Sequence, residues 1–283
     1  MIRVPPWKPR ASKMGLYAAC PRASYLDALI HKFPEHTPED GEYSSSAYAD
    51  LGTLIHDALQ TRLGCVMQTR MTESMAPLRT NAATLYSNEE ALEAAIASNV
   101  EWASSIFPAA PDGKAWVAEP EGETASLTGH LDFESQDGSA IIDLKTTARK
   151  PDNKRMKPLH LAQVVSYWNL RGRKAKWAGI LYLDSVKGAW AIMTDKVDFT
   201  NPMVIEYAND LDKLSRDLMR KDGIGSRAVP GDHCKSGFCS YRNSKICYAS
   251  LIPPGESSVV YENSGKAQPS AFQGPKSKEL KLW

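Results

Sequence analysis

The sequence has little net charge and no long hydrophobic run. Among 283 residues, 34 Lys and Arg stand against 33 Asp and Glu, which gives a formal net charge of +1. Such a balance predicts no molecule-wide field, so any attraction for nucleic acid must come from local clusters of charge. No apolar run approaches the roughly 18 residues typical of a membrane-spanning helix, and the first residues, MIRVPPWKPRASK, lack the apolar stretch of a secretory signal. We therefore expect a cytoplasmic protein with no membrane segment.

Cysteine is also scarce, and its spacing disfavours the common zinc pattern. The five cysteines include no C-x2-C pair, which is the arrangement typical of structural zinc sites. Cys20 stands alone near the start, whereas Cys234, Cys239 and Cys247 form a C-x4-C-x7-C cluster. Disulfides are rare inside cells, so we expect reduced thiols. An iron–sulfur cluster, a zinc ion and free thiols stay open as alternatives on spacing alone. Cys65 has no partner at a suitable spacing, which favours a small buried hydrophobe.

The segment GHLDFESQDGSAIIDLKTTARK, residues 129–150, predicts a β-hairpin with a polar face. Asp-Gly between apolar runs favours a turn at 136–139. We expect Asp132 on the first strand, and Asp143 and Lys145 two residues apart on the second, where both side chains point to one face. Two carboxylates can hold a hard cation that acidifies a bound water, and an ammonium can position that water. A solvated strand face with an ion pair is the alternative, because Asp-x-Lys is a common pattern.

Further polar residues stand at regular positions on both sides of this hairpin. A helical pattern over 47–63 carries the sequence G-T-x-x-H, which ends at His56. Glu119 closes a short predicted strand before the hairpin. Gln163 and Tyr167 lie four residues apart on a predicted helix after it, so they share one helical face.

Taken in chain order, these motifs (G-T-x-x-H, E, G-x-x-D, D-x-K and Q-x-x-x-Y) resemble the RecB-like branch of the PD-(D/E)XK nuclease superfamily over most of residues 15–250. One distant and three clustered cysteines are similar to the iron–sulfur subgroup of that branch, which includes CRISPR-associated exonucleases and AddB-type nuclease domains. The resemblance implies a [4Fe–4S] cluster that joins the chain ends and is held by Cys20, Cys234, Cys239 and Cys247. Zinc is the alternative occupant of these four cysteines.

The resemblance also implies roles for the polar residues. One or two Mg²⁺ or Mn²⁺ ions would be held by His56, Asp132, Asp143 and the backbone carbonyl of Leu144, with Glu119 as a further ligand. Lys145 would orient the attacking water. Gln163 and Tyr167 would orient Lys145 and the substrate, and for Tyr167 simple packing of the helix on the sheet is an equal alternative.

The implied fold is an α/β restriction-endonuclease-like core, in which helices flank a mixed central sheet. We expect one domain over 1–252, with a helical N-terminal part over about 12–104, a core over about 115–222 and a C-terminal cysteine cluster over 234–247. Helices are predicted over 12–31 with a break at Cys20-Pro21, over 88–104 and over 202–221, and two strands within 175–195. Residues 69–87 are polar and predict irregular structure, and the composition of 253–283 predicts a disordered tail.

The expected function is metal-dependent hydrolysis of DNA. The expected substrate is a single strand or a DNA end, which favours an exonuclease over an endonuclease. The resemblance implies recombination, CRISPR adaptation or phage DNA metabolism as the process, and a bacterial, archaeal or phage origin. The alternative is a non-catalytic or DNA-trimming subunit that mainly binds DNA or a partner in a larger complex. Two basic groups flank the predicted site in the sequence, and each is either a phosphate-binding surface or a solvated face. They are Arg149, Lys150, Lys154, Arg155 and Lys157, and Arg171, Arg173, Lys174 and Lys176.

The last five residues regain apolar character after a polar stretch. They are Glu279, Leu280, Lys281, Leu282 and Trp283. This peptide is similar to the Gln-Leu-x-Leu-Phe type by which bacterial replication and repair proteins dock on the sliding clamp, with Glu in place of Gln and Trp in place of Phe. A flexible linker would let it reach such a partner. A chance apolar terminus, or a strand that packs on the body, is the alternative.

Overall fold

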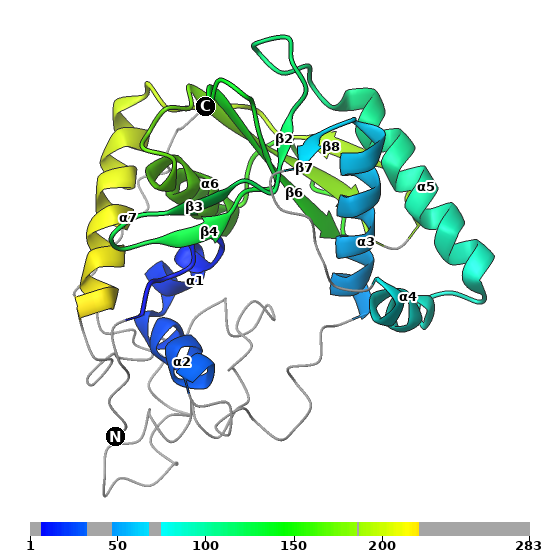
Figure 1. The fold of residues 1–283 in the computed structure, drawn as a ribbon, viewed down its shortest axis with the longest axis horizontal. Helices are drawn as coiled ribbons and strands as arrows, with labels where there is room; N and C mark the ends of the chain where they lie inside the picture. The colour runs from blue at the N-terminus through cyan, green and yellow to red at the C-terminus, as the bar shows by residue number, and fades with distance from the viewer. Residues whose placement is uncertain (1–6, 33–46, 68–74, 186, 221–283) are drawn as a thin grey trace, which may run out of the picture.

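The computed structural model describes residues 7–32, 47–67, 75–185 and 187–220. Within them, a mixed sheet lies between two groups of helices (Figure 1). The strand order is β1-β2-β5-β6-β7-β8, and β9 also pairs with β7. The strands are β1 (Val66–Met67), β2 (Val117–Ala118), β5 (Phe133–Glu134), β6 (Ala140–Thr147), β7 (Trp177–Asp184), β8 (Ala191–Met193) and β9 (Val197–Asp198). A separate hairpin joins β3 (Glu121–Glu123) to β4 (Thr128–His130).

The centre of the sheet is the parallel pair β6 and β7, matched over eight residues from Ala140↔Trp177 to Thr147↔Asp184. Most side chains in both strands are buried, because helices cover the two faces of the sheet, as is usual for parallel strands. Alternation along β6 sends Ile141 to one hydrophobic core and Ile142 and Leu144 to the other. The side chains of Asp143 and Lys145 therefore lie on the face that carries Ile141.

The helices divide between these two cores. The first core contains residues of η1 (Ala11–Lys13), α1 (Met14–Ala19), α2 (Pro21–Lys32), α6 (Pro158–Leu170) and α7 (Pro202–Arg220). The second contains residues of α3 (Ala47–Arg62), α4 (Ala76–Ala83) and α5 (Glu89–Ile106). The helices between residues 12 and 104 thus lie on opposite faces of the sheet. None of the helices in the described ranges combines the length and hydrophobicity of a membrane span.

The predicted α/β architecture is confirmed, with a mixed sheet flanked by helices. The hairpin is confirmed as the antiparallel pair β5 and β6, and the two strands expected within 175–195 are β7 and β8, which pair antiparallel. The expected helices are present as α1 and α2, α3, α5 and α7. The side chain of Asn88 accepts a hydrogen bond from Ala91 N at 2.8 Å and caps α5.

Two local predictions are wrong. The stretch expected to be irregular contains α4, which packs on α3; the Asn81 side chain donates to Asp50 Oδ2 at 2.6 Å and fixes that contact. A tertiary contact thus outweighs a weak local propensity. Asp132 does not lie on a strand but in a bend directly before β5. Its carboxylate is held there by a hydrogen bond from the backbone N–H of Leu144, at 2.6 Å.

Candidate active site

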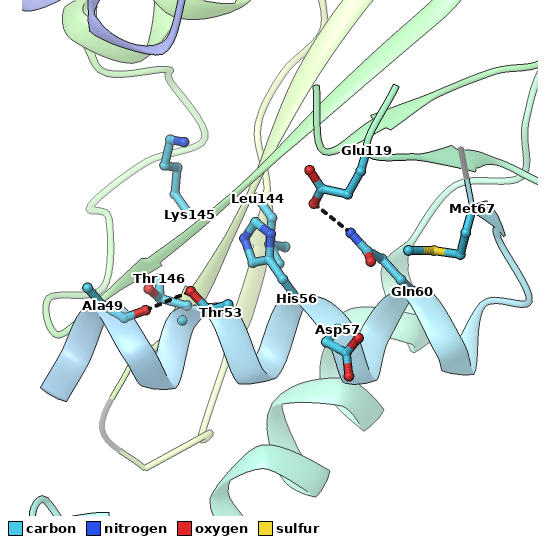
Figure 2. Close-up of a pocket in the computed structure, with 11 residues that line it drawn as sticks. Ala49, Thr53, His56, Asp57, Gln60, Met67, Glu119, Leu144, Lys145 and Thr146 are labelled. Atoms are coloured by element: carbon cyan, nitrogen blue, oxygen red, sulfur yellow. Dashed lines mark hydrogen bonds between the residues drawn. The ribbon is translucent and has the colours of Figure 1, made fainter. Parts of the chain in front are cut away.

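One face of α3 and the carboxyl half of β6 line a pocket (Figure 2). The α3 residues that line it are spaced three or four apart, so they form a single helical face. Gly52 lets this helix lie close to β6, since a Cβ atom there would come within 2.8 Å of Thr146 Oγ1. The lining residues are Ala49, Gly52, Thr53, His56, Asp57, Gln60, Met67, Glu119, Leu144, Lys145 and Thr146.

Three potential metal ligands converge at this pocket from different parts of the chain. His56 comes from α3, Glu119 directly follows β2 and Asp132 directly precedes β5. One ligand atom from each residue lies within 4.8 Å of the others, and His56 Nδ1 is 3.8 Å from Asp132 Oδ1. The Glu119 N–H donates to the backbone oxygen of Asp132 at 3.2 Å, so the two carboxylate-bearing segments are tied together.

Asp143 and Lys145 form an ion pair beside this group. Asp143 Oδ2 lies 2.9 Å from Lys145 Nζ; the aspartate side chain is fully buried, whereas the lysine side chain is 26% exposed. Gln163 Nε2 donates to Asp143 Oδ1 at 2.9 Å and to the Tyr167 hydroxyl at 2.7 Å. Gln163 therefore holds Asp143 in place, and the Tyr167 hydroxyl holds the amide of Gln163. Gln163 thus reaches Lys145 only through Asp143, and the expectation that the two α6 residues orient Lys145 and the substrate stays a prediction.

Burial dominates the ionisation of these groups. It raises the pKa of Asp132 to about 6 and that of Asp143 to about 7, although the Lys145 charge opposes both shifts. Burial and the Lys145 charge lower the pKa of His56 to about 4, so its imidazole is neutral at pH 7 and can act as a ligand. Burial alone would lower the pKa of Lys145, but the carboxylates of Asp143 and Asp132 outweigh it and raise that pKa.

The donor set fits a divalent cation. Carboxylate oxygens suit Mg²⁺ and Mn²⁺, and one imidazole nitrogen is compatible with Mn²⁺ in particular. Burying carboxylates so close together disfavours their charged forms, as the raised pKa values of Asp132 and Asp143 indicate, and a bound cation would remove that cost. Leu144 belongs to the same site through its backbone, because a backbone hydrogen bond between His56 and Leu144 contributes to the pKa of the imidazole.

Gln60 was not singled out by the sequence, although it lies in the pocket. Its Nε2 donates to Glu119 Oε1 at 2.9 Å (Figure 2). The available signal was its position four residues after His56, on the same helical face. A glutamine near the end of a helix carries no distinctive pattern, however, and its partner is 59 residues away in the chain.

The two basic groups lie in different places. The five residues from Arg149 to Lys157 are exposed and directly follow the carboxyl end of β6, close to Lys145. The group from Arg171 to Lys176 lies at the other end of that strand, where Lys176 N donates to Ser139 O at 2.8 Å. At about 3.3 Å per residue, Ser139 and Lys145 are roughly 20 Å apart. The second group therefore flanks the site in the sequence but not in space.

Of the five cysteines and the C-terminal peptide, the described residues include only Cys20 and Cys65. Cys20 is buried at the junction of α1 and α2, within the first core. Burial raises the pKa of the half-buried Cys65 thiol to about 11, as expected for a cysteine that packs rather than reacts. Cys234, Cys239 and Cys247 lie outside the described residues, as do Glu279, Leu280, Lys281, Leu282 and Trp283.

Comparisons with known proteins give one clear match. A family model for the PD-(D/E)XK nuclease superfamily matches residues 11–247. The comparison with curated proteins gave no match. An alkaline exonuclease (LHK-Exo) from Laribacter hongkongensis is 13% identical over 59% of this chain and 94% of its own, with a TM-score of 0.33. A phage-related exonuclease from Haemophilus somnus 129PT is 15% identical over 77% of this chain and 95% of its own, with a TM-score of 0.34. Both TM-scores are low, so neither likeness bears on the chemistry of the site.

Proposed function

The chain belongs to the PD-(D/E)XK nuclease superfamily, and we propose that it is a Mg²⁺- or Mn²⁺-dependent deoxyribonuclease that works as an exonuclease on single strands or DNA ends. The observation that carries the proposal is the convergence of His56, Glu119 and Asp132 within 4.8 Å of one another, beside the ion pair of Asp143 and Lys145. Recombination, CRISPR adaptation or phage DNA metabolism is the process in which such an activity fits.

The residues have distinct roles in this proposal. His56, Asp132, Asp143 and the carbonyl of Leu144 hold the cation, and Glu119 completes the set. When bound, the cation polarises the scissile phosphate and lowers the pKa of a water molecule. Lys145 is held beside Asp143 and is partly exposed, so its ammonium can donate to the attacking water or to a phosphate oxygen. Gln163 fixes Asp143 from the side of α6, and Tyr167 fixes the amide of Gln163.

The exposed basic residues 149–157 support DNA as the substrate. They follow β6 in the chain, beginning at Arg149, four residues after Lys145, and all five are exposed. Lys and Arg at such a place attract phosphates through a salt-sensitive electrostatic term. The group at 171–176 is not part of this surface, because Arg171 is engaged by Glu134 and Arg173 donates to Asn169 at 2.9 Å.

Two further parts of the proposal concern the rest of the chain. Within the superfamily, we place the protein in the RecB-like iron–sulfur subgroup, as a single domain over 1–252 closed by Cys20, Cys234, Cys239 and Cys247. The buried position of Cys20 between two helices suits a ligand shielded from solvent. The C-terminal peptide 279–283 is proposed to dock on a sliding clamp, with micromolar affinity on the order of −8 kcal/mol. Calorimetry with the last ten residues as a peptide, with and without Glu279→Gln, tests the docking.

A cleavage assay tests the central proposal. Labelled single-stranded, linear duplex and circular DNA are incubated with the protein, with Mg²⁺, Mn²⁺ or a chelator. We expect metal-dependent release of nucleotides from molecules with ends and none from circles. Lys145→Met and Asp143→Asn should lower the rate by about 10²-fold or more, because the first removes an ammonium beside the reacting phosphate and the second removes a charged ligand of the cation.

A matched histidine pair supplies the control. His56→Ala should weaken activity, with partial rescue by excess Mn²⁺, whereas His130→Ala should not. His130 lies 4.0 Å from Glu121 on the exposed hairpin of β3 and β4, so it resembles the His56–Asp132 pair without lining the pocket. Cleavage by Lys145→Met and Asp143→Asn at the wild-type rate would contradict the assignment. Cutting of circular DNA would refute the exonuclease part of the proposal and leave the nuclease assignment intact.

A further inference from the structure

We propose that Gln60 is a positioning residue whose side-chain amide holds the Glu119 carboxylate toward His56 and Asp132. This inference rests on the proposed function, because it concerns the same cation site. It adds a residue that no motif marks, together with a specific task for that residue: to fix the carboxylate of Glu119, whose backbone has a positive φ angle.

Gln60 is placed for this task by α3. It follows His56 by one helical turn, so both side chains leave the same face of the helix toward the pocket (Figure 2). Gln60 is 4% exposed, and its Nε2 lies 2.9 Å from Glu119 Oε1. A buried amide is costly unless it is hydrogen-bonded. The Glu119 carboxylate supplies that bond, so each group depends on the other.

Glu119 needs an external support because its backbone is unusual. Its φ angle is 51°, in the left-handed region that residues other than glycine rarely adopt. It follows β2, a strand of only two residues. Such a conformation persists only where its surroundings hold it, and it is found preferentially at functional sites. Two contacts supply the hold: the Glu119 N–H donates to Asp132 O at 3.2 Å, and the side chain accepts from Gln60.

The chemistry of an amide suits a ligand of a cation. Burial raises the pKa of Glu119, and the hydrogen bond from Gln60 acts against that shift by favouring the charged form. A lysine or arginine at position 60 would also stabilise the carboxylate, but its charge would compete with the cation. A neutral N–H donor orients one carboxylate oxygen and leaves the other available, as is common for groups that support metal ligands.

Metal binding by the full-length protein tests the inference without relying on activity. Mn²⁺ affinity is measured by electron paramagnetic resonance and by calorimetry. Gln60→Met keeps the size of the side chain and removes the donor, and we expect it to weaken Mn²⁺ binding by about 10-fold or more. Gln60→Asn keeps the amide on a side chain that is too short to reach Glu119, and it should show a similar loss of Mn²⁺ affinity. It serves as the second variant where the methionine variant folds poorly.

A matched contact on the same helix provides the control. Asn81 of α4 donates to Asp50 of α3 at 2.6 Å, so it is also an amide bonded to a carboxylate, but neither residue lines the pocket. Asn81→Leu should lower the melting temperature and leave Mn²⁺ affinity unchanged. In a Glu119→Gln background, Gln60→Met should have no further effect on Mn²⁺ affinity, because the group that it positions is already altered.

The outcomes separate the two proposals. If Glu119→Gln weakens Mn²⁺ binding but Gln60→Met and Gln60→Asn bind as the wild type does, the positioning role is wrong and the nuclease site stands. An additional loss from Gln60→Met in the Glu119→Gln background would also overturn the role, because Gln60 would then act through another group. If the wild-type protein binds no Mn²⁺, both the positioning role and the proposed function fail.

Discussion

The environment of His160 couples the folding of this protein to pH. Its Nδ1 lies 2.7 Å from the Tyr182 hydroxyl. Burial, followed by the charges of Lys145 and Lys157, lowers the pKa of His160 from 6.5 to about 3. The folded chain thus binds fewer protons at this site than the unfolded chain between those two values. The stabilisation is complete above pH 6.5 and is lost as the pH falls toward 3.

We expect His160 to add a falling contribution to the acid limb of the stability curve, opposite in sign to that of Asp132 and Asp143, whose raised pKa values let the folded chain bind more protons. Between pH 6.5 and about 4, it should lower the free energy of unfolding of the wild type by up to about 1.4 kcal/mol per pH unit. His160→Gln cannot take up the proton, so its curve should fall less steeply over that range. Urea denaturation at a series of pH values measures both slopes, with the exposed His130→Gln as the control. Parallel curves for wild type and His160→Gln would contradict the prediction.

Single residues also show where sequence reasoning succeeds and where it stops. The positions of Asp143 and Lys145 were predictable, because two-residue spacing on a strand places them on one face whatever surrounds the sheet. Gln60 was not, since its partner Glu119 is distant in the chain. The bend at Asp132 was equally hidden, because a hydrogen bond from Leu144 on the next strand defines it.

At the scale of secondary-structure elements, one arginine joins three of them. Arg171 follows the last residue of α6 and makes a two-pronged contact with Glu134 of β5, from Nε to Oε1 at 2.9 Å and from one terminal nitrogen to Oε2 at 2.7 Å. Its other terminal nitrogen donates to Glu121 O of β3 at 2.9 Å. The Glu134 side chain is 7% exposed and that of Arg171 is 28% exposed.

Breaking this contact on one side should cost more than removing it on both sides. Removing one partner leaves a charge without compensation, and because Arg171 is partly exposed we expect Glu134→Leu to lower the free energy of unfolding by about 2–3 kcal/mol. The double variant with Arg171→Leu should lose less than the sum of the two single losses. Equilibrium denaturation in urea completes the cycle. Strictly additive losses would show that the two side chains do not stabilise each other.

The elements themselves were predictable in proportion to their periodicity. Long patterns gave α3, α5 and α7 nearly at their observed bounds, because each buries a regular apolar face. The hairpin of β3 and β4 was missed, since its strands have only three residues each and much of it is exposed. Helix α4 was missed because its stability comes from α3. Which face of the sheet each helix covers is also decided by such contacts.

At the scale of the whole molecule, the question is how the chain is closed around its sheet. In our proposal Cys20 supplies one thiolate and the later cysteines supply three. We expect Cys20→Ser to lose iron and to unfold at a lower temperature, as with the loss of a structural metal centre. Cys65→Ser is the control, because that half-buried cysteine belongs to the second core. Elemental analysis and the absorption spectrum after anaerobic purification measure the iron.

The possible results discriminate between cofactors. Zinc in place of iron would refute the iron–sulfur cluster but would still support a metal that joins Cys20 to the later cysteines. Full iron in Cys20→Ser would refute both.

The alternation of side chains along β6 has a consequence for how the protein can fail. Asp143 and Lys145 face α6, while Leu144 between them is buried in the core beside α3. If β6 paired with its neighbours one residue out of step, the Leu144 side chain would point toward α6 in place of the two charged side chains, and both charges would enter an apolar core. Insertion or deletion of a single residue in the turn at 136–139 should therefore abolish folding and activity together, whereas a change of two residues keeps every side chain on its own face. Cleavage activity would thus report on the correct pairing of the central strand, because a molecule that had slipped could not be partly active.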